Sequence, residues 1–458
     1  MAIKHLQQKF ENLRLKHKQF IYRGFHYKIT QEALFMEFDF EIDDFVEFHP
    51  KLNIPNKEFV DFHSISVSML EQLIFNIGMV ELISYWKVIC PKEVYVQPFH
   101  LTADQIKFWK KIYYHGLGEF FFLNGIEISQ NDFMTIDCNS QGITMHAETI
   151  KVEESALIPV GGGKDSVVSM EVLKSEGNNI ALIMNPRGAS IATANIAGFE
   201  NKTLIINRTL DAKLLELNAK GYLNGHTPFS ALLAFVSFLA AAISHKKYIA
   251  LSNESSANES TVIGTKINHQ YSKSLEFESD FRKYSHKYLS HDINYFSLLR
   301  PLSELQIASI FAKNSAYFMD FKSCNVGSKT NSWCGKCSKC LFTFIILSPF
   351  VSPEVLADIF GANLLDDKEL KSYFDELTGI AELKPFECVG TVDEVNIALC
   401  LSKEFYRDKL PYLLEYYFKI VAPDNCEKAN NIQLSSIDEQ ANYLELVFLE
   451  KLKNKLWE

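Results

Sequence analysis

Short apolar runs alternate with helical spacing through the middle of the chain, and this alternation is its main structural pattern. Buried-type strands are expected at 156–160, 180–184, 203–206 and 248–251, and helices at 165–176, 227–245 and 304–313. Parallel strands need a crossover connection, usually a helix, so this order of elements predicts a parallel sheet with helices on both faces. Such sheets bind their ligands at the carboxyl ends of the strands.

The two ends of the chain have patterns of their own. Residues 1–150 mix strand-like runs with helical stretches, and residues 346–458 are mainly helical in spacing. Before the central part, strands are expected at 20–27, 34–40 and 93–98 and helices at 67–88 and 102–116; after it, helices are expected at 353–360, 367–377, 392–401, 408–421 and 436–457. We therefore predict an α/β fold with a mixed α+β domain at 1–150, a central parallel-sheet domain at 151–345 and a helical domain at 346–458.

Composition and charge limit the classes of partner. The chain is 47% hydrophobic and 22% charged, as folded globular proteins are. Its net charge of −10 argues against a general binder of nucleic acid or of anionic membranes, because such binders present basic surfaces. An anionic small-molecule substrate would need only a local basic patch, so this class stays open.

One uncharged segment, 227–244, approaches the length of a membrane span. Pro228 in its first turn and its alanines and serines favour a helix buried against a sheet, so no membrane insertion is expected. The first residues contain no apolar signal core, and the cysteines do not form the pattern of a secreted disulfide framework. We expect a cytoplasmic location, with isolated core thiols at Cys90, Cys138, Cys400 and Cys426.

The clearest chemical motif follows the strand expected at 156–160. Three glycines, Gly161 to Gly163, precede Lys164, Asp165 and Ser166 at the start of a helix. Glycines let backbone N–H groups face an anion, and a helix N-terminus adds partial positive charge, so this turn is suited to phosphate. It is not a Walker A loop, since Ile158 and Asp165 occupy the required Gly and Ser/Thr positions, and no later glycine completes a dinucleotide fingerprint.

This motif resembles the PP-loop of the ATP pyrophosphatase superfamily, usually S-G-G-x-D-S, with Gly161 in place of the first Ser. The resemblance extends from Ala156 to Phe344 and implies an adenine nucleotide α-hydrolase-like domain that cleaves ATP between its α and β phosphates. It implies that Gly161, Gly162, Gly163 and Ser166 hold phosphate, that Asp165 binds Mg²⁺, and that Lys164 neutralises phosphate charge.

Four cysteines form a second motif, C-x9-C-x2-C-x2-C, at Cys324, Cys334, Cys337 and Cys340. Four thiolates complete a tetrahedron and leave no open position, which predicts a structural Zn²⁺; an iron–sulfur cluster or free thiols are the alternatives. The end of the motif, Cys-Gly-Lys-Cys-Ser-Lys-Cys, resembles the zinc tail of the PP-loop enzyme that makes 7-cyano-7-deazaguanine. That family is much shorter, so the resemblance leaves both flanking domains unexplained.

A longer family fits these features together. The chain resembles the UDP-N-acetyl-α-D-muramoyl-L-alanyl-L-glutamate epimerase family, MurL. The resemblance rests on the domain before residue 150, the Gly-rich loop, the segments 252–254 and 268–274, and Lys-Pro-Phe-Glu-Cys-Val-Gly at 384–390. The resemblance implies that ATP and Mg²⁺ are used to adenylate the glutamate carboxylate of a UDP-MurNAc dipeptide. The adenylate acidifies the α-proton, which allows inversion to D-Glu for peptidoglycan precursors and releases AMP and pyrophosphate.

The roles of single residues stay open at this point. Cys388 is either the base that takes the α-proton or a small buried residue. His269 and Lys273 are alternative bases or phosphate ligands. Asn253 and Glu254 are candidate cofactor contacts, with Glu254 either a second Mg²⁺ ligand or a helix cap. Arg187, Arg208 and Arg300 either clamp a carboxylate or diphosphate or form ordinary ion pairs. Two other functions stay open: an adenylating PP-loop ligase and a non-catalytic ATP-binding regulator.

Overall fold

A computed structural model describes residues 2–174, 177–262, 267–406, 409–420, 426 and 434–457, with side chains from residue 6 onward. The chain forms two compact units, each built from segments distant in sequence. The first consists of Met1–Leu157, Leu204–Ile249 and Tyr271–Tyr295, and the second of Ile158–Thr203, Ala250–Gln270 and Phe296–Glu458. The domain boundaries at residues 150 and 345 stay a prediction.

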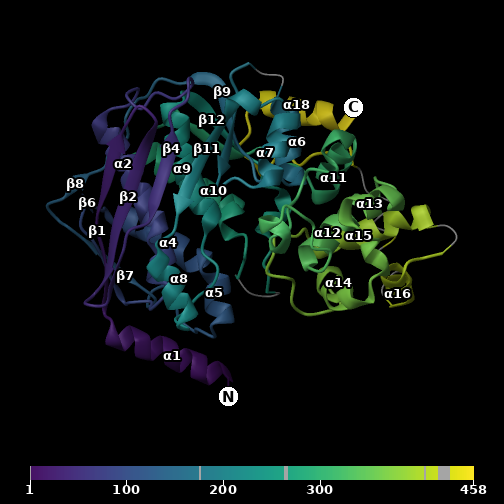
Figure 1. Cartoon of the computed structure of the whole chain (residues 1–458), viewed down its shortest axis with the longest axis horizontal. Helices are drawn as coiled ribbons and strands as arrows, with labels where there is room; N and C mark the ends of the chain where they lie inside the picture. The colour runs from purple at the N-terminus through teal and green to yellow at the C-terminus, as the bar shows by residue number, and fades with distance from the viewer. Residues whose placement is uncertain are drawn as a thin grey trace. The chain divides into compact units, whose positions relative to one another are not determined.

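An 11-stranded sheet runs through the fold and confirms the α/β class, while its arrangement as a PP-loop domain stays a prediction (Figure 1). Its strand order is β13-β12-β9-β10-β11-β4-β2-β1-β5-β7, with β3 paired to β2. The strands are β1 (Gln19–Ile29), β2 (Ala33–Ile42), β3 (Val46–Phe48), β4 (Lys51–Pro55), β5 (Glu93–Val96), β7 (Thr135–Cys138), β9 (Glu153–Pro159), β10 (Ile180–Met184), β11 (Thr203–Thr209), β12 (Lys246–Leu251) and β13 (Asn294–Ser297). A separate pair is β6 (Phe99–His100) with β8 (Ile143–Thr144).

The strand order reverses at β9. Strands β10 and β11 follow it on one side, and β12 and β13 follow it on the other, with β12 parallel to β9. Such a reversal leaves a crevice at the carboxyl ends of the strands, where ligands of doubly wound sheets bind. The glycines Gly161 to Gly163 come directly after β9 and therefore lie at this position.

The first unit has an aromatic core on the antiparallel strands β1, β2 and β4. Tyr22, Phe38 and Phe40 are buried there, and the Tyr22 ring stacks on Phe75 of α2. Its helices are α1 (Ala2–Lys16), α2 (Val67–Glu81), α3 (Ile83–Trp86), α4 (Ala103–Gly116), α5 (Gly118–Leu123), α8 (Ala212–Ala219), α9 (Phe229–Ile243) and α10 (Leu275–Tyr288). Helices α1 to α5 and strands β1 to β8 all lie before residue 150, so this part mixes helices and strands as expected, while its bounds as a domain stay a prediction.

The uncharged segment 227–244 forms α9, whose side chains are almost all buried, as predicted. Within the described residues, one helical stretch is long and apolar enough to cross a membrane. It is Val67–Trp86, with a mean hydropathy of 1.3, and 83% of it is buried inside the fold. Burial on this scale is what a core helix shows.

The second unit is rich in helices. They are α6 (Lys164–Leu173), α7 (Gly188–Ile196), α11 (Glu304–Ala312), α12 (Ser338–Leu347), α13 (Pro353–Phe360), α14 (Lys371–Thr378), α15 (Val392–Ser402), α16 (Tyr412–Ile420) and α18 (Leu446–Trp457). Helices α12 to α16 gather in one group, green to yellow in Figure 1. This confirms the helical character expected after residue 346. The helix predicted at 408–421 has both ends outside the described residues.

Two expectations for the C-terminal part are wrong. The helix predicted to begin at Ser436 begins only at Leu446. Cys400 and Cys426 are not isolated thiols, because they form a disulfide across a separation of 26 residues. Nothing in the sequence around either cysteine indicated this pairing, since disulfide partners are set by the fold and not by local spacing.

Candidate functional site

The Gly-rich loop between β9 and α6 has a backbone that only glycine can adopt. Gly162 has φ +90°, and a Cβ there would lie 2.6 Å from the backbone N of Ser190. The loop is also tied down by hydrogen bonds: Gly162 N donates to Ser166 Oγ at 3.2 Å, and Ser166 Oγ donates to the Gly163 carbonyl at 3.0 Å. A turn packed this closely against α7 is preformed rather than adaptable.

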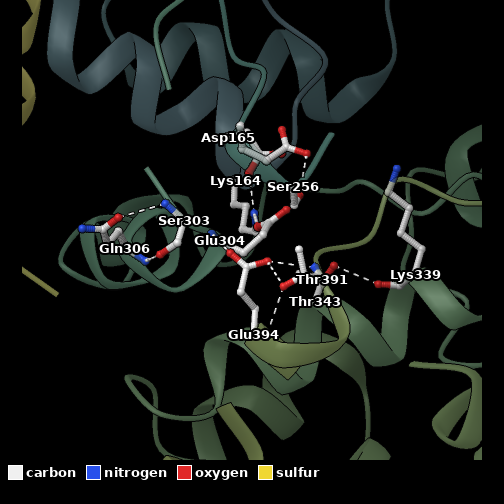
Figure 2. Close-up of polar contacts among 11 residues, drawn as sticks. Lys164, Asp165, Ser256, Ser303, Glu304, Gln306, Lys339, Thr343, Thr391 and Glu394 are labelled. Atoms are coloured by element: carbon white, nitrogen blue, oxygen red, sulfur yellow. Dashed lines mark hydrogen bonds and ion pairs between the residues drawn. The ribbon is translucent and has the colours of Figure 1, made fainter. Parts of the chain in front are cut away.

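Lys164, the first residue of α6, does not extend into solvent. Its ammonium donates to the carboxylates of Asp165 and Glu304, and Figure 2 shows the three side chains converging. Side-chain exposure is 5% for Lys164 and 34% for Asp165. Burial lowers the pKa of Lys164, but Asp165 and Glu304 raise it by more, so Lys164 stays cationic. Asp165 is thus the open end of this cluster.

Glu304 is the buried end of the cluster and begins α11. Burial raises the pKa of its carboxyl well above the ordinary value; Lys164 opposes this, and the nearby carboxylates Asp165, Glu254 and Glu394 raise it further. One buried cation therefore faces several acidic groups. The excess of acidic groups over cations would favour binding of a further cation beside the Gly-rich loop.

Glu394 connects two helix N-termini. Its Oε2 accepts from Thr391 N at 2.8 Å and from Thr391 Oγ1 at 2.9 Å, which caps α15. Its Oε1 accepts from Glu304 N at 2.8 Å, in the first turn of α11 (Figure 2). Each contact places negative charge at a helix N-terminus, where it is favourable.

The residues after β12 lie in the same unit and are buried. Asn253 Nδ2 donates to Ser297 Oγ at 3.0 Å. Arg300, 2% exposed, donates from Nη1 to the Glu254 carbonyl at 2.6 Å and from Nη2 to Ser297 Oγ at 3.2 Å. The Glu254 carboxylate accepts from Ser256 Oγ at 3.3 Å. Arg300 therefore holds the backbone that presents Glu254.

The segment Lys384–Gly390 is joined to these parts at several points. Lys384 pairs with Glu259 and donates to the Gly390 carbonyl at 2.9 Å, which closes the segment on itself. The Glu387 carboxylate accepts from Asn325 Nδ2 at 2.7 Å, next to Cys324. Cys388 is half-buried within this closed segment.

The four clustered cysteines come together around one point. All four sulfurs lie within 4.8 Å of one another, with Cys337 Sγ 3.9 Å from Cys324 Sγ and 3.5 Å from Cys340 Sγ. Tetrahedral zinc–thiolate sites with bonds of about 2.3 Å have sulfurs roughly 3.8 Å apart, so this cluster fits Zn²⁺. The cluster also adjoins the Gly-rich loop, because Lys322 N, two residues before Cys324, donates to the Gly162 carbonyl at 2.8 Å.

The other candidate residues lie in varied settings. Arg187 is exposed at the N-terminus of α7, and the backbone N of half-buried His269 donates to Thr261 Oγ1 at 3.0 Å. Lys273 and Arg208 belong to the first unit. Arg208 makes a two-pronged contact with Glu81, with N–O distances of 2.9 to 3.1 Å.

Glu304 and Glu394 were not singled out from the sequence. Glu304 follows Ser303, and Glu394 stands three residues after Thr391; both contexts are capping boxes and signal only that helices begin there. Their contact joins positions 90 residues apart, which local signals do not reveal.

Comparison with known proteins extends over most of the chain. The family model of the MurL N-terminal domain matches residues 11–298, more than half of the chain, and that of the MurL C-terminal domain matches residues 320–423. A protein of Xanthomonas oryzae pv. oryzae named UDP-N-acetyl-alpha-D-muramoyl-L-alanyl-L-glutamate epimerase is 34% identical over 370 residues, which cover 76% of this chain and 81% of that protein.

Two further relatives carry the same printed name. The protein from Micromonospora sp. is 33% identical over 346 residues, covering 74% of this chain and 76% of that protein. The protein from Salinispora tropica is 33% identical over 345 residues, covering 74% of each chain. No solved structure matches the chain.

Proposed function

The chain belongs to the MurL family of UDP-N-acetyl-α-D-muramoyl-L-alanyl-L-glutamate epimerases and is therefore an isomerase; from this premise we propose that it works through a carboxyl adenylate. The substrate is UDP-MurNAc-L-Ala-L-Glu, whose terminal L-Glu becomes D-Glu. ATP is consumed to AMP and pyrophosphate, and the product serves peptidoglycan precursor synthesis.

The chemistry explains why an epimerase would need ATP. Removing the α-proton next to an ionised carboxylate would place two negative charges on adjacent groups. A carboxylate oxygen that attacks the α-phosphorus of ATP, with pyrophosphate leaving, loses its charge and becomes an electron-withdrawing acyl adenylate. A base then takes the α-proton, a proton returns to the opposite face, and water releases AMP and the inverted carboxylate.

The observation that carries the proposal is the position of the Gly-rich loop at the carboxyl end of β9, where the strand order reverses. We propose a PP-loop domain in which Gly161 to Gly163 and Ser166 receive the phosphates. Asp165 and Glu254 are suited to Mg²⁺, a hard cation that prefers carboxylate oxygens. Because Lys164 is paired with Asp165 and Glu304, its charge acts on the phosphates from within the protein.

For the α-proton we propose Cys388 as the base, because its segment closes next to Glu304, which accepts from Lys164, and next to Glu394. His269, from the same unit, is the second candidate. Arg187 is exposed and suited to a substrate carboxylate or diphosphate, and Lys273 stays a substrate-binding candidate on the sequence alone. The buried Arg300 acts on the substrate site through the Glu254 backbone.

The four-cysteine cluster would hold a structural Zn²⁺ that fixes the loop after Lys322 against Gly162. A cytoplasmic location, where nucleotide-linked precursors and ATP are both present, completes the proposal.

The test is an incubation with UDP-MurNAc-L-Ala-L-Glu, ATP and Mg²⁺ in D₂O. The proposal expects AMP and deuterium at the glutamate α-carbon to appear together. AMP without deuterium would point instead to a PP-loop ligase, and ATP binding without AMP to a regulator; either result would contradict the proposal.

Two variants separate the roles. Asp165→Asn is expected to abolish AMP formation. Cys388→Ala is expected to keep adenylation, seen as exchange of labelled pyrophosphate into ATP, and to lose deuterium incorporation. If incorporation survives in Cys388→Ala, the base lies elsewhere. A thiol outside the proposed site, Cys138→Ala in β7, is the matched control.

A further inference from the structure

The carboxylate of Glu394 is bound on both sides by groups that belong to different parts of the second unit. Thr391 donates twice to Oε2, and the backbone N of Glu304 donates to Oε1. Glu394 is 9% exposed, so water cannot easily replace these donors. The carboxylate therefore joins the first turn of α15 to the first turn of α11.

The α11 side of this junction leads to the nucleotide loop. Glu304 uses its backbone to reach Glu394 and its side chain to reach Lys164, at the start of α6. Both ends of the Lys164–Glu304 pair are buried, with 5% and 3% of the side chains exposed. A buried pair has few alternative partners, so the position of α11 is set by the loop that carries Lys164.

The α15 side leads to the segment that carries Cys388. A Cβ on Gly390 would lie 3.0 Å from both Glu304 Cγ and Glu394 Oε2, closer than carbon normally approaches (Figure 2 shows the two glutamates). Gly390 thus lies directly on the two carboxylates, and its carbonyl accepts from Lys384 at 2.9 Å. The C-terminal end of the Lys384–Gly390 segment is held by Glu394.

We propose that Glu394 is a positioning residue that fixes the Cys388 segment relative to the nucleotide loop, so that proton transfer depends on it while adenylation does not. This inference rests on the proposed function. Its effect passes through Gly390 on one side and Glu304 on the other.

The test uses Glu394→Gln in the full-length protein. A glutamine has one acceptor oxygen and can serve Thr391 or Glu304, but not both. The expected result is a fall of about tenfold or more in deuterium incorporation, with less than about threefold change in the exchange of pyrophosphate into ATP. Equal losses in both assays, or no loss in either, would overturn the inference.

Two further variants separate positioning from stability. Gly390→Ala breaks no hydrogen bond but pushes the segment off the carboxylates, so the same split between the assays is expected. Thr391→Val removes the hydroxyl cap of α15 and keeps the Glu394–Glu304 link, so it should lower the melting temperature without the split. The proposal would be contradicted if Thr391→Val lost deuterium incorporation while keeping pyrophosphate exchange, or if Gly390→Ala did not show this pattern.

Glu354→Gln is the matched control, since Glu354 occupies the exposed first turn of α13. Failure of the proposed function can be distinguished from failure of this inference. In that case wild-type protein itself produces no AMP or no deuterated product, whereas failure of this inference leaves wild-type activity intact and only the split missing.

Discussion

Lys164 donates a hydrogen bond to the side chain of Glu304 inside the second unit, although the two residues are 140 residues apart in sequence. The contact connects the Gly-rich loop to α11, and the carboxyl of Glu304 has a raised pKa because it is buried, in spite of the opposing charge of Lys164. A raised folded-state pKa has a direct consequence for stability.

The first prediction concerns Glu304→Gln. Above the ordinary glutamate pKa of 4.5 the unfolded chain releases the proton of Glu304 while the folded chain retains it, so the free energy of unfolding falls as pH rises toward the folded pKa. The slope is at most about 1.4 kcal/mol per pH unit for one proton. Glu304→Gln should lack this contribution. Urea unfolding of both proteins between about pH 5 and pH 7 gives the free energy of unfolding at each pH. If this free energy changes with pH equally in both proteins, the prediction is refuted.

The second prediction concerns the Gly-rich loop. Gly162→Ala places a Cβ against the backbone of Ser190 at a φ of +90°, so it should destabilise the protein by on the order of 3 kcal/mol. Gly161→Ala is the matched control, since a Cβ there meets nothing within 4 Å. Thermal unfolding of the two variants measures the difference. Equal melting temperatures would show that the loop is not packed as described.

The third prediction concerns the cysteine cluster. Purified protein should contain one Zn²⁺ per chain, and Cys337→Ser or a strong chelator should remove it. Because the loop between Lys322 and Cys324 supports Gly162, loss of the metal should lower the melting temperature by about 10 °C and weaken ATP binding.

Cys138→Ser, at a half-buried thiol outside the cluster, should keep both metal content and melting temperature. Elemental analysis and calorimetry decide the matter. If the protein instead contains iron and absorbs in the visible range, the site is an iron–sulfur cluster and not a zinc site. If it contains no metal, the four cysteines are free thiols.

Local patterns predicted much of the fold. Strand β10 has the expected bounds, and α4 lies within the helix expected at 102–116. Strand β13 was missed, because Asn294–Ser297 is too short to show a period. The Gly-rich loop was identified because its chemistry is contiguous. Glu304 and Glu394 were not, since their role arises only when α11 and α15 meet.

The placement of β11 beside β4 bears on how the protein can be divided. Residues Asn207–Thr209 pair with Lys51–Asn53, so the N-terminal strands cover the side of β11 that would otherwise be an open edge of the sheet. A fragment starting near residue 150 would expose unpaired backbone groups along β11, and such open strands recruit other chains. The N-terminal part therefore protects the sheet that carries the loop from edge-to-edge association, and truncation should yield aggregates rather than a minimal enzyme.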